Sequence, residues 1–167
     1  IHVYQGKHPY TSYHVTQGHE VSGMIEKVGS KVTDFKPGDK VTIQPQVVCG
    51  ECYSCTHGRY HICDHLKVMG FQVTGMASEF FVTEAKRVLK LPDDMSYEEG
   101  AMIEPMAVAC GVFTKTDYLR GLNIIVLGSG PIGNLTAQTA KALGAKSVLI
   151  TDVSDYRLGL AKKVGID

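Results

Sequence analysis

The residues whose spacing most clearly indicates chemistry are four cysteines, Cys49, Cys52, Cys55 and Cys63. They follow the pattern C-x2-C-x2-C-x7-C. Each C-x2-C step lets a turning backbone direct two sulfur atoms at one point, and the fourth sulfur can close a tetrahedral shell around Zn²⁺ from across a short loop. A shell of four thiolates leaves no open coordination position. The spacing therefore predicts a structural zinc site.

Other roles for clustered cysteines are less well supported. A disulfide framework is typical of secreted chains with an even number of cysteines, whereas this chain has five, and its first residues, IHVYQGKHPY, do not resemble a secretory leader. An iron–sulfur cluster also takes four thiolates, but the other motifs of the chain argue against it. Because thiolate ligands require a reducing compartment, we expect a cytoplasmic protein. The fifth cysteine, Cys110, is expected to be a small buried residue on an apolar helix face.

A glycine motif, G-x-G-x-x-G, follows a strand-like apolar segment and opens a helix-like one, which is the context in which it binds a dinucleotide. Its residues are Gly128, Ser129, Gly130, Pro131, Ile132 and Gly133. Gly128 permits the tight turn, Gly130 lets a pyrophosphate approach the backbone, and Gly133 allows the helix to pack closely on the strand. The helix N-terminus offers free N–H groups to phosphate.

Asp152 ends the next apolar segment, 19 residues after Gly133. A carboxylate at this position accepts hydrogen bonds from the ribose hydroxyls and repels a 2′-phosphate, so the sequence predicts NAD rather than NADP. The alternative is an ordinary strand–turn–helix glycine cluster, and the position of Asp152 makes that the weaker interpretation.

The elements that must position these residues change in type near residue 95. Before it, short segments rich in Val, Ile and Phe alternate with Gly and Pro, which is typical of a β-barrel or a β-sandwich. We expect strands within 21–29, 40–48 and 78–92. The cysteine loop interrupts this pattern, and it has so few apolar residues that zinc would be its main support.

Beyond residue 95 the pattern is helical and then β-α-β. Ser96 and Glu99 form a capping box, and Pro105 suits the first turn of a second helix. The further elements we expect are a strand at 122–128, a helix at 131–143 that stops at Gly144, a strand at 147–152 and a helix from 155.

The overall composition argues against several classes of partner. The 167 residues carry 17 Lys and Arg and 17 Asp and Glu, and 44% of them are hydrophobic. This is typical of a globular protein. Because no basic patch stands out, we expect neither nucleic acid nor a membrane surface as a partner. No run of 18 apolar residues occurs, so no transmembrane helix is expected.

His19 and Glu20 precede the first expected strand. Taken alone, His19 would more often be a hydrogen-bonded structural histidine than a metal ligand. The order of motifs, however, is distinctive: Gly-His-Glu, the cysteine loop, Glu104-Pro105, and the glycine turn with Asp152. In this order, over nearly its whole length, the chain resembles the zinc-dependent medium-chain alcohol dehydrogenases, and within them the sorbitol (polyol) dehydrogenase branch.

The resemblance implies a role for each matching residue. His19 matches the imidazole ligand of a catalytic zinc ion, and Glu20 the adjacent carboxylate, which binds that zinc or lies just behind it. Glu104 stands where polyol dehydrogenases supply a carboxylate and ethanol-type enzymes a cysteine, which favours a polyol substrate. His2 falls where the family often carries a histidine that relays the proton, although a second residue could simply be mobile. The histidines that flank the cysteines are expected to be surface residues: His57, His61 and His65.

The resemblance also implies a fold and an activity. The fold is α/β with a β-rich part: a GroES-like β-barrel catalytic domain over 1–115, and then the start of a Rossmann NAD-binding domain over 116–167. The implied activity is hydride transfer from a secondary alcohol, such as a polyol or sugar alcohol, to NAD at a zinc site. The alternatives are a threonine or butanediol dehydrogenase, a zinc-free reductase of the same superfamily, or a non-catalytic zinc-binding module.

The chain departs from the family pattern at both ends. The cysteine ligand of the family's catalytic zinc would lie just before Ile1. Only two of the roughly six strands of a Rossmann sheet are visible. We therefore expect a fragment of a longer enzyme, homo-oligomeric in its full-length form. Residues 120–167 would then be sensitive to protease or paired with another chain, since an open edge of a parallel sheet exposes apolar surface.

Overall fold

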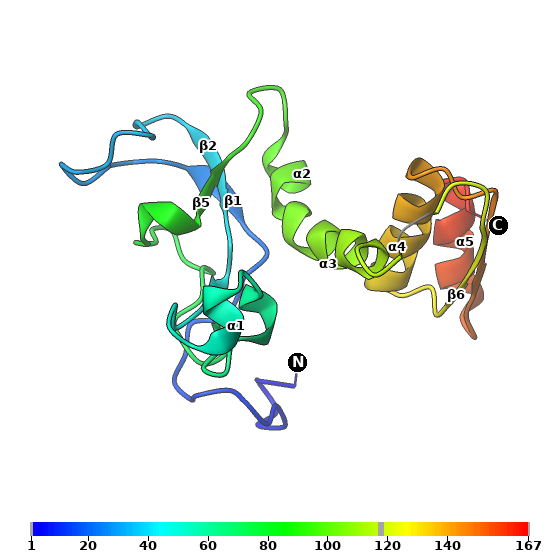
Figure 1. Ribbon diagram of the computed structural model, residues 1–167, viewed down its shortest axis with the longest axis horizontal. Helices are drawn as coiled ribbons and strands as arrows, with labels where there is room; N and C mark the ends of the chain where they lie inside the picture. The colour runs from blue at the N-terminus through cyan, green and yellow to red at the C-terminus, as the bar shows by residue number, and fades with distance from the viewer. Residues whose placement is uncertain (1, 117–118, 167) are drawn as a thin grey trace. The chain divides into compact units, whose positions relative to one another are not determined.

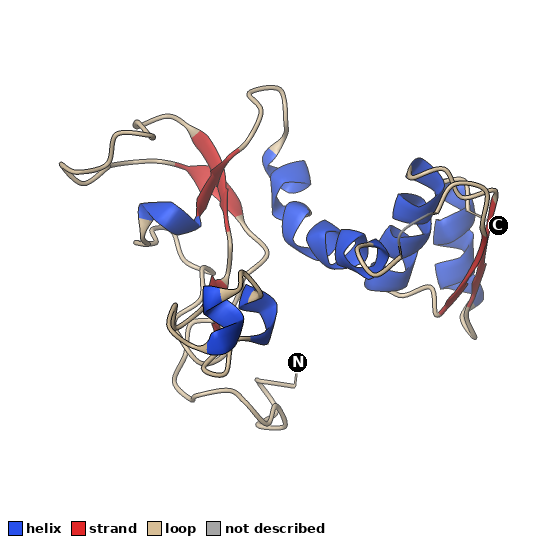
Figure 2. Ribbon diagram, viewed as in Figure 1, coloured by secondary structure: helices blue, strands red, loops and turns tan. Residues whose placement is uncertain are grey.

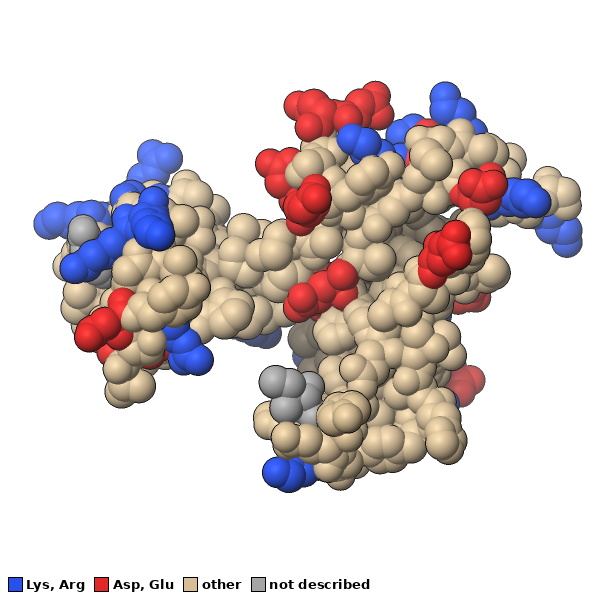
Figure 3. Space-filling view, turned by 180° about the vertical axis from the view of Figure 1, so that it is seen from behind, with Lys and Arg blue, Asp and Glu red and all other residues tan. Residues whose placement is uncertain are grey.

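Two compact units make up the computed structural model, which describes residues 2–116 and 119–166. The first unit is Ile1–Ala101 and the second is Met102–Asp167. Loops that connect short strands and short helices make up the first unit, and helices packed on a small sheet form the second (Figures 1 and 2). Acidic and basic side chains both appear on each unit in the face shown in Figure 3. Within the described residues, no helix has the length and apolar character needed to cross a membrane.

The first unit contains a three-stranded antiparallel sheet. Its strands, in spatial order, are β1 (Ser22–Met24), β2 (Lys40–Ile43) and β5 (Val88–Lys90). Thr42 pairs with Ser22 on one side and with Leu89 on the other. Val41 of the central strand and Leu91 just beyond β5 are both buried. The turn before β2 contains Gly38 at φ +92°, as expected for the glycine of a Pro-Gly turn.

A second small sheet and several short helices complete this unit. The sheet pairs β3 (Gln46–Val47) with β4 (Lys67–Val68) in antiparallel register. Pro45, which has no N–H to donate, separates β2 from β3. The cysteine loop carries α1 (Tyr53–Thr56) and the 3-10 turn η1 (Tyr60–Ile62), and a second 3-10 turn, η2 (Ala85–Arg87), precedes β5. Because the strands and helices of this unit are short, the apolar stretches in the first half of the sequence are short as well.

Of the one or two strands expected within 78–92, one is present, Val88–Lys90. Residues 79–83 have no ladder partner among the described residues, and Phe80 and Val82 are exposed. The Ser78 hydroxyl donates a hydrogen bond to the Phe80 carbonyl, which turns the chain locally. An alternating apolar pattern forms a strand only when a neighbouring strand is present to pair with it.

The capping box at the start of α2 (Tyr97–Ala101) is confirmed. The Ser96 backbone N–H and hydroxyl both donate to Glu99 Oε2 at 2.8 Å, and the Glu99 N–H donates to Ser96 Oγ at 3.2 Å. These donors hold the pKa of Glu99 below its usual value, with the Ser96 N–H as the main cause. The helix therefore begins where its side chains satisfy its first backbone groups.

The second unit is a parallel β-α-β arrangement with a further helix on each side in sequence. Its elements are α3 (Ile103–Phe113), β6 (Asn123–Leu127), α4 (Pro131–Ala142), β7 (Ser147–Thr151) and α5 (Asp155–Lys163). β6 and β7 run parallel, with Asn123 opposite Ser147 and Leu127 opposite Thr151. α4 contacts both strands, and α3 packs against α4.

The core of the second unit lies between the sheet and its helices. It is made of Ala137, Ile150, Ala161 and Ile166, with Val126, Val148 and Leu158 packed against it. Ile125 and Leu127 alternate with Val126 along β6 and are 65% and 82% exposed. One face of the two-stranded sheet is therefore apolar and open in the described residues, as expected for an isolated pair of parallel strands.

The expectation that Cys110 is buried is wrong, because this residue is exposed. The buried positions of α3 are Pro105 and Ala109, four residues apart on one face of the helix. Cys110 follows Ala109 directly and so lies about 100° around the helix from that face.

Replacing Gly133 by alanine should strongly destabilise the second unit. A Cβ atom at Gly133 would lie 1.9 Å from the Gly128 carbonyl oxygen, a backbone atom that cannot rotate away. We expect the free energy of unfolding to fall by at least about 2 kcal/mol, as measured by urea denaturation. Gly159→Ala in α5 is the matched control, since its Cβ would meet no atom within 4 Å. It should stabilise the helix by roughly 0.5–1 kcal/mol. Equal unfolding midpoints for the two variants would contradict the close approach.

Candidate metal centres and dinucleotide turn

The four cysteine side chains converge on one point. Their Sγ atoms all lie within 4.8 Å of one another, with Cys55 and Cys63 buried and the other two partly buried. The short helix α1 begins after Cys52 and contains Cys55, while Cys63 follows η1. Gly50, at φ +81°, turns the chain between the first two cysteines. The short helices α1 and η1 thus bring together four sulfur atoms that come from positions along the whole loop.

Backbone N–H groups surround the sulfur atoms. The N–H of Cys49 and that of His65 each donate to Cys63 Sγ at 3.4 Å, and the N–H of Cys52 donates to Cys49 Sγ at the same distance. The backbone N–H of Asp64, followed by that of Cys55, lowers the pKa of Cys52 to about 6. Burial raises the pKa of Cys55 to about 12. The four converging sulfur atoms fit the ligand set of a structural zinc ion.

The three histidines near the cysteines lie on the surface, as expected: His57, His61 and His65 are exposed. His57 is held by Tyr53, since its Nδ1 is 2.8 Å from the Tyr53 carbonyl oxygen and the two rings stack with centroids 4.1 Å apart. The predicted ligand set at this centre therefore consists of sulfur alone.

The segment that carries His19 and Glu20 is fixed by a backbone-to-backbone contact. The N–H groups of Gly75, Met76 and Ala77 donate to the carbonyls of Thr16, Gly18 and Gln17 at 2.7–2.9 Å. A Cβ at Gly70 would lie 2.9 Å from Gly18 N, and one at Gly75 would lie 2.5 Å from Gln17 O. Only glycine fits at these two positions, so the chain around 70–77 positions the residue before His19.

A cavity of about 470 Å³ lies beside this contact, within the first unit. It is lined by His2, Val3, His8, Gln17, Gly18, His19, Glu20, Gly70 and Phe71. The structure thus places three of the predicted catalytic residues, His2, His19 and Glu20, on one cavity. Phe71 was not predicted from the sequence, and its ring packs against His19 with centroids 5.2 Å apart. No motif marked it, because its position depends on the fold of the 70–77 segment.

Glu104 lies in the first turn of α3 in the second unit and is partly buried. Its assignment to a metal centre with His19 and Glu20 joins residues of two separate units. That assignment stays a prediction.

The glycine turn has the geometry that the motif requires. Gly128 has φ +102°, in the left-handed region that favours glycine, and Gly133 approaches the Gly128 carbonyl closely. Gly130 is the N-cap of α4, and Pro131 is its first residue. No side chain caps α4, so the N–H groups of its first turn could donate to an anion. Ile132 follows Pro131 in that turn and is 41% exposed.

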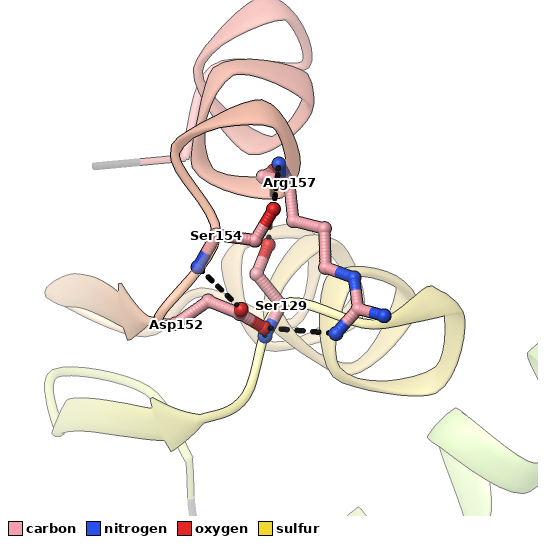
Figure 4. A network of polar contacts seen from close by, with 4 residues as sticks. All are labelled: Ser129, Asp152, Ser154 and Arg157. Atoms are coloured by element: carbon pink, nitrogen blue, oxygen red, sulfur yellow. Dashed lines mark hydrogen bonds and ion pairs between the residues drawn. The ribbon is translucent and has the colours of Figure 1, made fainter.

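Asp152 binds the glycine turn directly (Figure 4). Its Oδ2 accepts a hydrogen bond from Ser129 N at 2.7 Å, and its Oδ1 accepts one from Ser154 N at 2.9 Å. Arg157 Nη1 lies 3.6 Å from the same carboxylate, which is only 5% exposed. The Ser129 N–H is the largest cause of the lowered pKa of Asp152, followed by the Ser154 N–H. The spacing of the motif predicts Asp152, whereas Ser154 and Arg157 lie beyond the motif and were not predicted from it.

The carboxylate of Asp152 therefore does two things. It ties the turn after β6 to the end of β7 and the start of α5, and it remains ionised at neutral pH. Each carboxylate oxygen has two lone pairs, so these bonds leave capacity to accept from the hydroxyls of a ribose.

Comparison with known proteins identifies related sequences and structures. Residues 1–93 match the family model of the alcohol dehydrogenase GroES-like domain. The chain is 39% identical over 149 residues to a sorbitol dehydrogenase of Bacillus subtilis, with 89% of this chain and 42% of that protein covered. The chain spans 41% to 49% of the lengths of the curated relatives that it matches.

Two solved structures resemble the chain over 99% of its length. A zinc-binding dehydrogenase of Sinorhizobium meliloti bound to NADP has a TM-score of 0.92 and 32% identity, with 48% of that chain covered. An alcohol dehydrogenase of Escherichia coli CFT073 complexed with NADH has a TM-score of 0.91 and 35% identity, with 49% covered. The architecture of each unit is thus one that occurs in coenzyme-bound dehydrogenases.

Acidification should destabilise the second unit through Asp152. The pKa of this carboxyl is lowered in the folded state. Its contribution to stability is therefore complete above the unfolded pKa of about 3.9 and is lost as the pH falls through the folded value. Asp152→Asn should lower the unfolding midpoint in urea at pH 7 and flatten the acid limb of the pH profile. Asp155→Asn is the control, because Asp155 is exposed and makes none of these contacts. Parallel pH profiles for wild type and Asp152→Asn would contradict this assignment.

Proposed function

The chain belongs to the alcohol dehydrogenase GroES-like domain family. On this premise we propose that it is part of an NAD-dependent polyol dehydrogenase, and that it contains the zinc ligands and the glycine turn that binds the coenzyme. The reaction is hydride transfer from a secondary alcohol to NAD. The observation that carries the proposal is the cavity of about 470 Å³ on which His2, His19 and Glu20 meet. Its volume is in the range of pockets that hold small ligands, and these three residues are ones that the resemblance matches to the family's site.

The four cysteines would hold a structural zinc ion. Four converging sulfurs leave no position for a substrate, so this site supports the fold of the loop rather than the reaction. In an unfolded chain the thiols lie far apart, and the free energy of binding the metal would therefore add to the stability of the loop.

His19 and Glu20, with Glu104, would hold the catalytic zinc ion. When bound, that ion acts as a Lewis acid toward the alcohol. The protein's own contribution is orientation: the hydrogen bonds of the 70–77 segment hold the backbone before His19, and the Phe71 ring packs against its imidazole. His2 lines the same cavity and would pass the alcohol proton toward solvent.

The glycine turn and Asp152 would bind the coenzyme. The uncapped first turn of α4 would receive the pyrophosphate, and Asp152 would accept hydrogen bonds from the ribose hydroxyls. Relatives of this architecture are seen with NADP and with NADH. We propose NAD for this chain because a buried, ionised carboxylate would repel a 2′-phosphate.

The proposed substrate is a small polyol or sugar alcohol, and the related sorbitol dehydrogenase supports this class.

The cytoplasm is the proposed location, because free thiols persist there as metal ligands. The enzyme is proposed to be a homo-oligomer, which is the commonest arrangement of soluble oligomers.

The test is the zinc-dependent oxidation of sorbitol with NAD, followed by NADH absorbance, together with zinc content per chain. His19→Ala should remove one zinc ion per chain and lower kcat/KM at least about 100-fold, since it deletes a ligand of the Lewis acid. His14→Ala is the matched control, because His14 is exposed and does not line this cavity. Unchanged zinc content and rate in His19→Ala would overturn the proposal.

A further inference from the structure

His8 lines the same cavity as His19, although the proposed function gives it no role. It is partly buried, and its ring stacks on Phe71 with centroids 4.6 Å apart and an interplanar angle of 17°. The phenyl ring also packs against His19, whose imidazole is tilted by 47° to it with centroids 5.2 Å apart. Phe71 therefore contacts both imidazoles, and a change at His8 can reach His19 through the phenyl ring.

Contacts from its own segment hold His8 in place. Thr11 Oγ1 lies 2.8 Å from His8 Nδ1. A hydroxyl can either donate to this nitrogen or accept from it, so the contact is compatible with both tautomers of the imidazole. One residue further along, the backbone N–H of Ser12 donates to the Phe71 carbonyl at 2.9 Å. Residues 8–12 are thus attached to Phe71 twice, through the stacked rings and through the backbone.

Phe71 belongs to the segment that positions the backbone next to His19. Directly before it, Gly70 approaches Gly18 so closely that an added Cβ would lie 2.9 Å from Gly18 N. This contact places the main chain, but the imidazole of His19 can still rotate about its own side-chain bonds. Packing of the phenyl ring against the imidazole restricts that rotation, and the His8 ring covers a face of the same phenyl ring.

The orientation of a metal ligand matters because its lone pair must point at the metal. Functional side chains need to be held within roughly 10–20° of the productive direction by neighbours whose own rotamers are fixed. Loss of a neighbour that orients a ligand typically weakens metal binding or activity about 10- to 100-fold. A ring that packs against a ligand, and that is itself fixed by a second ring, meets this requirement.

We propose that His8 is a positioning residue for His19 and that it acts through Phe71. The stacked ring of His8 holds the phenyl ring in place, and the phenyl ring holds the imidazole of His19 in the orientation that binds zinc. His8 contacts neither the metal nor the substrate in this role. The inference rests on the proposed function, because it concerns the orientation of a ligand of the same site.

The test is a double-mutant cycle at His8 and Phe71 with two readouts. The first is the NMR order parameter of the isotope-labelled His19 ring, measured in the chain supplied with one equivalent of zinc for the cysteine loop. The second is the affinity for Co²⁺ that is added afterwards, followed by its d–d absorption. The first readout reports the orientation of His19 directly and requires no metal at this site.

His8→Leu removes the stacked ring, so the His19 order parameter should fall and Co²⁺ should bind about tenfold more weakly. Phe71→Leu should lower both at least as much. Because both residues act on His19 by one route, adding His8→Leu to Phe71→Leu should change neither readout further. His8→Phe keeps an aromatic ring against Phe71 and should recover most of the loss. His14→Leu, at an exposed histidine outside the cavity, should match wild type.

Three results would overturn the inference: a His19 ring as ordered in His8→Leu as in wild type, additive losses in the double variant, or a His8→Phe variant as impaired as His8→Leu. The two proposals fail separately. Zinc-dependent turnover with a His19 ring that His8→Leu leaves unchanged would overturn the role of His8 and leave the proposed function intact. A His19 ring that becomes mobile in His8→Leu, in a chain that neither binds Co²⁺ at this site nor oxidises sorbitol, would support the positioning by His8 and overturn the proposed function.

Discussion

Backbone segments approach each other at both candidate sites so closely that no side chain larger than hydrogen fits between them. In the first unit Gly70 and Gly75 meet the backbone of Gln17 and Gly18, and in the second Gly133 meets the carbonyl of Gly128. Each contact positions a chemical group: the imidazole of His19 in one unit, and the uncapped start of α4 in the other. A methyl group at any of these positions would separate the segments and move the group they hold. The sites thus depend on glycine as much as on their polar residues.

Around these contacts, polar side chains have hydrogen-bond partners. Among the described residues that are not exposed, no buried side-chain nitrogen or oxygen lacks a hydrogen-bond partner. Asp152 keeps its charge at low exposure because two backbone N–H groups donate to it. The cysteine sulfurs receive N–H donors from their own loop. At Asp152 the backbone, rather than the arginine alone, stabilises the negative charge.

Local sequence was informative where a motif is completed within a few residues. The cysteine spacing, the capping box at Ser96 and the glycine turn each correspond to a geometry that the structure shows, because short-range chain stiffness determines them. The sequence was less informative where the outcome depends on a distant neighbour. The apolar alternation at residues 79–83 does not form a strand, since no strand in the described part of the chain pairs with it. Phe71 and Thr11 carried no motif because their contacts with His8 exist only in the folded first unit.

We propose that this chain holds zinc in two chemically different centres, one of sulfur and one of nitrogen and oxygen. Zinc X-ray absorption spectroscopy of the metal-loaded protein distinguishes the two, because scattering distances differ between the ligand types. We expect a sulfur shell at about 2.3 Å together with a nitrogen and oxygen shell at about 2.0–2.2 Å. A spectrum without sulfur scattering would contradict the cysteine centre, and a spectrum of sulfur alone would contradict the centre at His19 and Glu20.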